Sequence, residues 1–121
     1  MSAKTKQTNI LEACLGRSAG LDALVGYSED SIVSKTILDK KAGTLTLFAF
    51  DRGQSLSEHT SPYDAVVQVV DGHARITIDG QDQEVQAGEL IVMPANVPHA
   101  VMAVERFKML LIMIRDERHT K

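Results

Sequence analysis

The chain contains no tryptophan, a single cysteine and only 4% aromatic residues, although 44% of its residues are hydrophobic. Aliphatic side chains and five methionines must therefore fill the interior. Because Cys14 has no partner for an internal disulfide, nothing in the composition requires an oxidising compartment. We interpret Cys14 as a small hydrophobic residue and not as a nucleophile, since no base lies near it in the sequence.

A clustered basic segment and a long apolar segment are also lacking. The net charge of -3 gives no electrostatic reason to bind nucleic acid, which excludes that partner from our expectations. The polar residues 1–9 are not followed by a long apolar run, a pattern that predicts neither a signal peptide nor a membrane anchor. We therefore expect a cytoplasmic protein of one domain that has no membrane partner.

Short runs of β-branched and aromatic residues predict strands, and the turn signals between them recur roughly every 8 to 12 residues. The strongest turns are expected at 39–43, Asp71-Gly72 and Asp79-Gly80. This spacing is typical of an antiparallel sandwich or barrel. The expected strands are 32–38, 44–50, 64–70, 74–78, 83–85, 90–93 and 107–114.

The two ends of the chain carry weaker signals. Residues 1–9 are expected to be disordered, and 10–15 are predicted to form a short helix that Gly16 ends. Thr8 or Asn9 is the expected cap of that helix. The charged residues 115–121 are expected to form a solvated, frayed tail.

The last expected strand ends in six consecutive apolar residues, 109–114. Such a strand must be covered on both faces, and in so small a domain a partner subunit is the expected cover of the outer face. We therefore predict a homodimer that buries Leu110, Ile112 and Ile114 or their neighbours of opposite parity.

Two segments that begin with glycine each carry one histidine, in the patterns Gly53-x5-His59 and Gly88-x5-Pro94-x4-His99. This pair resembles the two motifs of the cupin superfamily, in its small, single-domain, cupin 2-type form. The resemblance implies an all-β fold, a double-stranded β-helix also called a cupin or jelly-roll barrel. It divides the chain into a short helical or irregular extension (1–31), the barrel (32–114) and a flexible tail (115–121).

The first motif in full reads Gly-x5-His-x-His-x3-Glu-x6-Gly. Gly53, His59 and Gly72 match it. Ser61 stands at the position of the second histidine, and Ala65 stands at the position of the glutamate. Two of the positions that usually hold the metal are therefore occupied by residues that cannot hold it.

The second motif reads Gly-x5-Pro-x-Gly-x2-His-x3-Asn, and Gly88, Pro94 and His99 match it. Asn96 replaces the glycine and Ala103 replaces the asparagine. Because asparagine tolerates the left-handed backbone that glycine often signals, the turn is expected to survive this change.

The resemblance implies that His59 and His99 converge on a divalent transition metal such as Zn, Fe, Ni, Cu or Mn. Asp64 is the candidate third ligand, although strand alternation directs it opposite to Ala65. A β-bulge between His59 and Asp64 would reverse that direction. The alternative is a pair of neutral histidines hydrogen-bonded to each other, to Ser61 or to water.

Three residues near the motifs are candidate ligand-binding residues: Tyr63 through its ring or hydroxyl, and Met93 and Met102 as adaptable apolar contacts. His73 and His119 are interpreted as surface residues. No catalytic residue is assigned.

Two functions remain open from the sequence. One is binding of a small-molecule ligand at the barrel mouth, with a depleted His59/His99 metal site and no committed reaction. The alternative is a metal-dependent enzyme, an isomerase, lyase or dioxygenase that acts on a small sugar or organic acid. A barrel that serves only dimerisation has no feature in its favour beyond the apolar last strand.

Overall fold

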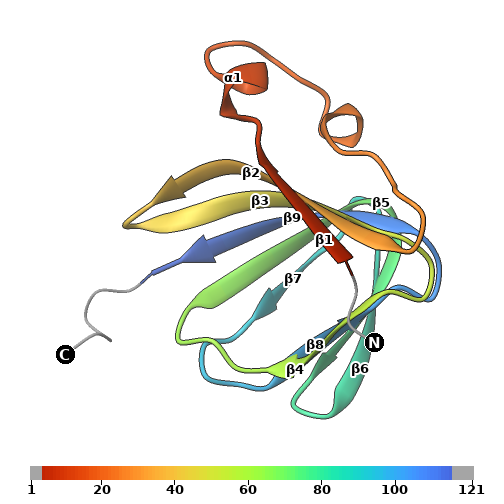
Figure 1. Ribbon diagram of the computed structural model, residues 1–121. Helices are drawn as coiled ribbons and strands as arrows, with labels where there is room; N and C mark the ends of the chain where they lie inside the picture. Colours follow the sequence, from red (N-terminus) through yellow and green to blue (C-terminus); the bar gives the residue numbers. More distant parts are fainter. Residues whose placement is uncertain (1–3, 116–121) are drawn as a thin grey trace.

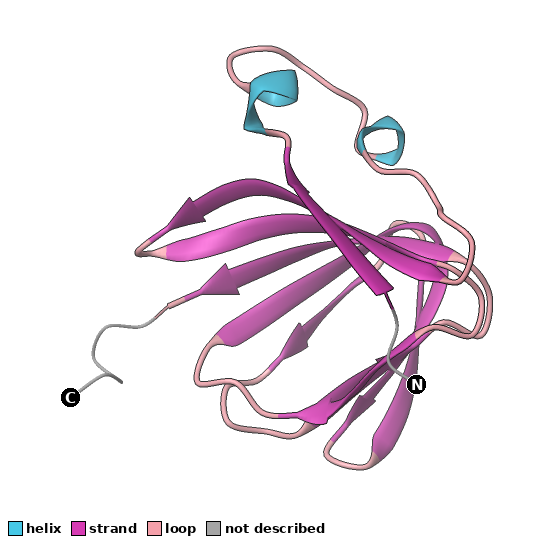
Figure 2. Cartoon of the chain, in the orientation of Figure 1, coloured by secondary structure: helices cyan, strands magenta, loops and turns pink. Residues whose placement is uncertain are grey.

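The computed structural model describes residues 4–115, and nearly all regular structure in this range is strand (Figure 2). Its helices are two short turns, and no helix among these residues is long and apolar enough to cross a bilayer. The elements are β1 (Lys4–Asn9), α1 (Leu11–Cys14), the 3-10 helix η1 (Asp22–Leu24), β2 (Ser31–Lys40), β3 (Gly43–Phe50), β4 (Ser55–His59), β5 (Asp64–Ile78), β6 (Gln81–Gln86), β7 (Leu90–Met93), β8 (His99–Met102) and β9 (Phe107–Ile114).

The strands form two layers that share β5, whose 15 residues run through both (Figure 1). The first half of β5 pairs with β7 and β9, and β9 continues through β3 and β2 to β1, giving the upper sheet. The second half of β5 pairs with β6 and β8, and β8 pairs with β4, giving the lower sheet. This curled, mainly antiparallel arrangement confirms the prediction of an all-β barrel.

The prediction of a turn at Asp71-Gly72 was wrong, because β5 continues through these residues from one sheet to the other. The chain does not reverse there; the register with β9 shifts between Val69 and Asp71, and Gly72 has a φ of 72°. A β-bulge of this kind bends a strand without ending it. The sequence signal at Asp71-Gly72 was therefore a bend inside one long strand.

Alternation along the strands fills one end of the barrel with apolar side chains. Phe50 and Phe107 are fully buried there and stack with ring centroids 4.5 Å apart. Ile32 and Ile76, which are also fully buried, belong to the same cluster. Burying such side chains stabilises the fold by about 1.5–3 kcal/mol each.

The beginning of the chain differs in part from the expectation. Residues 4–9 form β1, a parallel partner of β2, where disorder was predicted; residues 1–3 lie outside the described range, as does the tail beyond Arg115. The predicted short helix is confirmed as α1. The N-cap position of α1 is Ile10, not the predicted Thr8 or Asn9, and Ile10 makes no side-chain cap hydrogen bond; the side chain of Asn9, one residue earlier, accepts a hydrogen bond of 3.0 Å from the N–H of Leu11.

Over β2, β3 and part of β9, the outer face of the upper sheet is covered by residues 10–27 of the same chain, which lie above β2 and β3 in Figure 1. Val25 packs in one buried cluster with Leu110, and Ile112 packs against that cluster. Leu110, one of the residues predicted to lie in a dimer interface, is therefore covered by the chain's own N-terminal segment, and the homodimer itself stays a prediction. Ile114 remains 56% exposed.

Polar contacts hold the N-terminal segment in place. The Lys108 ammonium is buried and lies 2.8 Å from the Asp22 carboxylate. The Tyr27 hydroxyl donates a hydrogen bond to Asp71, and burial together with that carboxylate raises the pKa of Tyr27. These contacts join η1 and the following loop to β9 and β5.

Candidate functional site

The two motif histidines are direct partners in the pairing of β4 with β8. Leu56 is opposite Val101 and His59 is opposite His99, so three steps along β4 correspond to two steps along β8. This register shift is a β-bulge, and it lies before His59 and not between His59 and Asp64, where the sequence suggested one. The bulge decides the orientation of His59, because an odd spacing would otherwise place it on the face opposite to Leu56.

The bulge leaves the two imidazoles in contact. Their ring centroids are 4.4 Å apart and the ring planes meet at 72°, an edge-to-face arrangement. His99 is 4% exposed, whereas His59 is exposed at the surface. The pair therefore reaches from the barrel interior to the solvent.

A backbone carbonyl fixes the tautomer of each ring. Nδ1 of His59 lies 2.8 Å from the carbonyl oxygen of Ser57, and Nδ1 of His99 lies 3.2 Å from that of Val97. A carbonyl oxygen can only accept, so in the neutral rings Nδ1 carries the proton and Nε2 keeps its lone pair. The same arrangement orients histidines that bind metals, and here it provides two Nε2 acceptors.

Both histidines line a cavity of about 70 Å³ at the end of the barrel away from the phenylalanine stack. Because exposed His59 belongs to the lining, the cavity reaches the surface beside it. The walls are mainly aliphatic and thioether side chains, and among the described lining residues none is a carboxylate, a thiol or a cation. The lining comprises Leu56, His59, Ser61, Ala65, Met93, His99, Val101, Met109, Leu111 and Met113.

The positions at which the motif resemblance places metal ligands all belong to this lining. They carry an imidazole at His59, a hydroxyl at Ser61, a methyl group at Ala65 and an imidazole at His99. Asp64 does not join them: it is exposed, and its carboxylate accepts a hydrogen bond of 2.9 Å from the N–H of Ala95. Strand alternation at the start of β5 thus directs Asp64 outward, as its neighbour Ala65 points inward.

The three predicted ligand-binding residues divide in the same way. Met93 is 4% exposed and lines the cavity. Met102 is 40% exposed and Tyr63 lies beneath the Arg115 guanidinium at 5.5 Å, and neither belongs to the lining. Sequence reasoning missed Met113 as a cavity residue, because only the register of β9 against β5 brings it beside Ala65.

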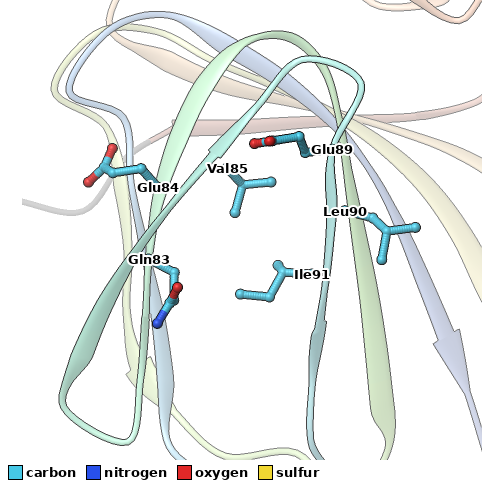
Figure 3. A pocket seen from close by; sticks show the side chains of 6 residues that line it. All are labelled: Gln83, Glu84, Val85, Glu89, Leu90 and Ile91. Carbon is cyan, nitrogen blue, oxygen red and sulfur yellow. The ribbon is translucent and has the colours of Figure 1, made fainter.

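A second hollow lies on the outside of the barrel between β6 and β7 (Figure 3). Val85 and Ile91 form its floor, and its two carboxylates already have partners. Glu84 pairs with Arg75 at 2.7 Å, and Glu89 accepts a hydrogen bond from a backbone N–H. With both of its carboxylates engaged, this groove is a weaker candidate than the histidine cavity.

The buried histidine predicts a dependence of stability on pH. Burial, reinforced by His59, lowers the pKa of His99 below its ordinary value of 6.5. As the pH falls below 6.5, His99 therefore becomes protonated more readily in the unfolded chain than in the folded chain. The free energy of unfolding decreases as a result. We expect urea denaturation between about pH 7.5 and 5.5 to show this loss, with a smaller loss in His99→Gln. An unchanged slope in His99→Gln would contradict the assignment.

Comparison with known proteins identifies the family. The model of the cupin domain matches residues 46–115. The chain belongs to the cupin family. A cupin 2 conserved barrel domain protein from Leptotrichia buccalis is 44% identical, with a TM-score of 0.75, and the match covers 77% of this chain and 45% of that one. No curated protein matches the chain.

Two other solved cupin-like structures match over most of their length. A conserved protein of unknown function from Streptococcus pyogenes is 39% identical over 83% of this chain and 88% of its own, with a TM-score of 0.80. A cupin superfamily protein from Desulfitobacterium hafniense is 30% identical over 83% and 92%, with a TM-score of 0.79. These neighbours support the cupin fold without naming a ligand or a reaction.

The donor set of this cupin does not fit the four-ligand metal site that its motifs imply. Catalytic sites normally keep three protein ligands, and here only the two imidazoles remain, since Ser61 and Ala65 occupy the other motif positions. Within residues 4–115, no group of three or more histidine, cysteine, aspartate or glutamate residues could hold a metal ion. We therefore derive no reaction through such a metal.

Proposed function

We propose that this cupin binds a small molecule at the open end of its barrel, without a committed reaction. The observation that carries the proposal is the pair of imidazoles, His59 and His99, in a cavity whose other lining residues are apolar except for Ser61. Ligand sites commonly combine concave apolar walls with a few polar groups that fix orientation. The cavity matches this description, because it combines two Nε2 acceptors with a methionine-rich wall.

The charge of the lining favours a neutral ligand with hydrogen-bond donors. No lysine or arginine stands among the described lining residues, and the lowered pKa of His99 keeps that ring neutral near pH 7. A carboxylate would therefore lose water without gaining a cationic partner. A hydroxyl or amide N–H can instead donate to Nε2. Because about 70 Å³ is well below the size of a typical ligand pocket, only a small group enters and the remainder of the ligand lies beside His59.

The proposal is tested by saturation-transfer NMR with matched neutral and acidic compounds. We expect signals from small alcohols, polyols and amides at about pH 7.5, and none from carboxylates of the same size such as acetate and lactate. Preferential binding of the carboxylates would contradict the proposed ligand class. Absence of binding by every compound would contradict the proposed function.

The enzymatic alternative, a metal-dependent isomerase, lyase or dioxygenase, receives less support from the side chains. It needs a third metal ligand or a placed acid or base, and Asp64 is turned away from the imidazole pair. Elemental analysis of protein purified without a histidine tag or chelator tests this alternative. One zinc, iron, nickel or manganese per chain would favour the enzyme over the binding protein.

We also propose that two copies of the chain pair through the outer face of β7, β5 and β9. Leu90, Val92 and Ile114 are 61%, 49% and 56% exposed on this face. Val66 lies opposite both Val92 and Ile112, so these three residues form an apolar row across the three strands. Exposed apolar surfaces of this kind are typical of protein interfaces. Leu110 takes no part, because residues 10–27 cover it.

The dimer is tested with Val92→Lys, which places a charge in the centre of the apolar face. We expect sedimentation at micromolar concentration to show a dimer for the native chain and a monomer for Val92→Lys. Met102→Lys is the matched control, because Met102 is an exposed apolar residue on the lower sheet. A native chain that sediments as a monomer would contradict the proposed pairing.

A further inference from the structure

We propose that the methionines beside Ala65 and the two imidazoles form a binding site for Cu(I). Ala65 of β5 is the direct partner of Met93 on β7 and of Met113 on β9. Side chains of directly opposite residues lie on the same face of a sheet, with Cβ atoms about 4.5–5.5 Å apart. The methyl group of Ala65 therefore has a thioether side chain on each side, at the motif position of the glutamate.

These thioethers and the histidines face the same cavity. Met93, Met113, His59 and His99 all belong to its lining, and Met109 adds a further sulfur deeper in the barrel. Met93 and Met109 are 4% and 2% exposed. Three methionines and two histidines from four strands thus line one cavity of about 70 Å³.

The chemistry of these donors selects the metal. Thioethers are soft ligands that favour Cu(I), and imidazole binds copper as well. The hydrogen bonds from Nδ1 to the carbonyls of Ser57 and Val97 leave each Nε2 free to coordinate. All of these ligands are neutral, so a divalent ion would enter an apolar cavity with no compensating charge, which costs more than the entry of a monovalent ion. Carboxylate-preferring ions such as Mn²⁺ find no carboxylate in the described lining.

This inference rests on the proposed function in one respect, the role of His59 and His99 as binding groups, and it adds a sulfur-dependent ligand for the same cavity. The thioethers separate the two claims experimentally. A neutral organic ligand needs the imidazoles and an apolar wall, which leucine also provides, whereas Cu(I) needs the sulfur atoms.

The test is an anaerobic titration of the protein with Cu(I) in competition with the chromophoric chelator bicinchoninate, in a Cys14→Ser background that removes the only thiol. We expect one tightly bound Cu(I) per chain. Met93→Leu and Met113→Leu should each weaken binding at least about tenfold, since leucine keeps the volume but loses the sulfur. Met102→Leu, which changes a methionine outside the cavity, should bind as tightly as the parent.

Copper K-edge X-ray absorption of the loaded protein supplies the second readout, with sulfur and nitrogen scatterers expected around the metal. Thermal unfolding of each apo variant shows that the leucine substitutions have folded. The inference is overturned if no Cu(I) binds, or if both leucine variants of the cavity bind as tightly as the parent. Loss of Cu(I) binding with retained binding of neutral organic compounds would overturn the copper site and leave the proposed function standing.

Discussion

Replacing Gly72 with alanine is expected to destabilise the barrel by about 2–5 kcal/mol. Gly72 has a φ of 72°, a left-handed conformation that costs an L-residue about 1–2 kcal/mol. A Cβ atom at this position would also overlap the carbonyl oxygen of Arg106 and lie 3.2 Å from Cα of Phe107. Phe107 is fully buried, so the backbone cannot move without disturbing the core, and such overpacking costs about 1–3 kcal/mol more.

Gly88→Ala is the matched control for this prediction. Gly88 has a φ of 90°, but no atom lies within 4 Å of the position that a Cβ would occupy. Its substitution should therefore cost only the conformational part, about 1–2 kcal/mol. Urea denaturation of the two variants measures the difference. Equal losses would show that the close approach of β5 to β9 at Gly72 does not constrain the fold.

Substitution of either cavity histidine should have the largest effect on binding. His59→Ala and His99→Ala are each expected to weaken binding of a neutral ligand from the NMR panel at least about tenfold, because a lost hydrogen bond to a buried group costs about 1–3 kcal/mol. His59 is exposed, so His59→Ala should retain nearly native stability. Its effect on binding is therefore the cleaner of the two measurements.

His73→Ala is the control for both variants, because His73 lies outside the cavity and pairs with Glu84 at 3.6 Å. Calorimetric titration with the same neutral ligand gives the dissociation constants of the three variants and of the native chain. Similar dissociation constants for His59→Ala, His73→Ala and the native chain would show that the imidazole pair does not bind the ligand. A ligand lost equally in all three variants would indicate a general defect in folding.

The motif spacing predicted much of the site from the sequence. Gly53 and Gly88 both have positive φ angles, as turn glycines do, and Asn96 has a φ of 65°, in agreement with its expected tolerance of the left-handed conformation. His59 and His99 share one cavity, as predicted. These features were accessible because turn chemistry is local and the two histidines hold equivalent places in their motifs.

Long-range pairing explains what the sequence did not reveal. The segment Lys4–Asn9 is polar and shows no strand signal, because its pairing with β2 is made by backbone groups. The bulge before His59 depends on the register of β4 against β8, which no local pattern records. The covering of Leu110 could likewise not be predicted from a local pattern, because it depends on the packing of residues 10–27 over β2 and β3.

We propose that His59 and His99 act together as the binding groups of one cavity. Long-range proton–nitrogen NMR correlations of the imidazole rings test it most directly, recorded at about pH 7.5 with and without the tightest neutral ligand of the panel. We expect the Nδ1–H tautomer in both rings, because the carbonyls of Ser57 and Val97 accept those hydrogen bonds. We also expect the ligand to shift both Nε2 resonances and to leave those of His73 unchanged. A proton on Nε2 of either ring, or a ligand that shifts neither resonance, would contradict it.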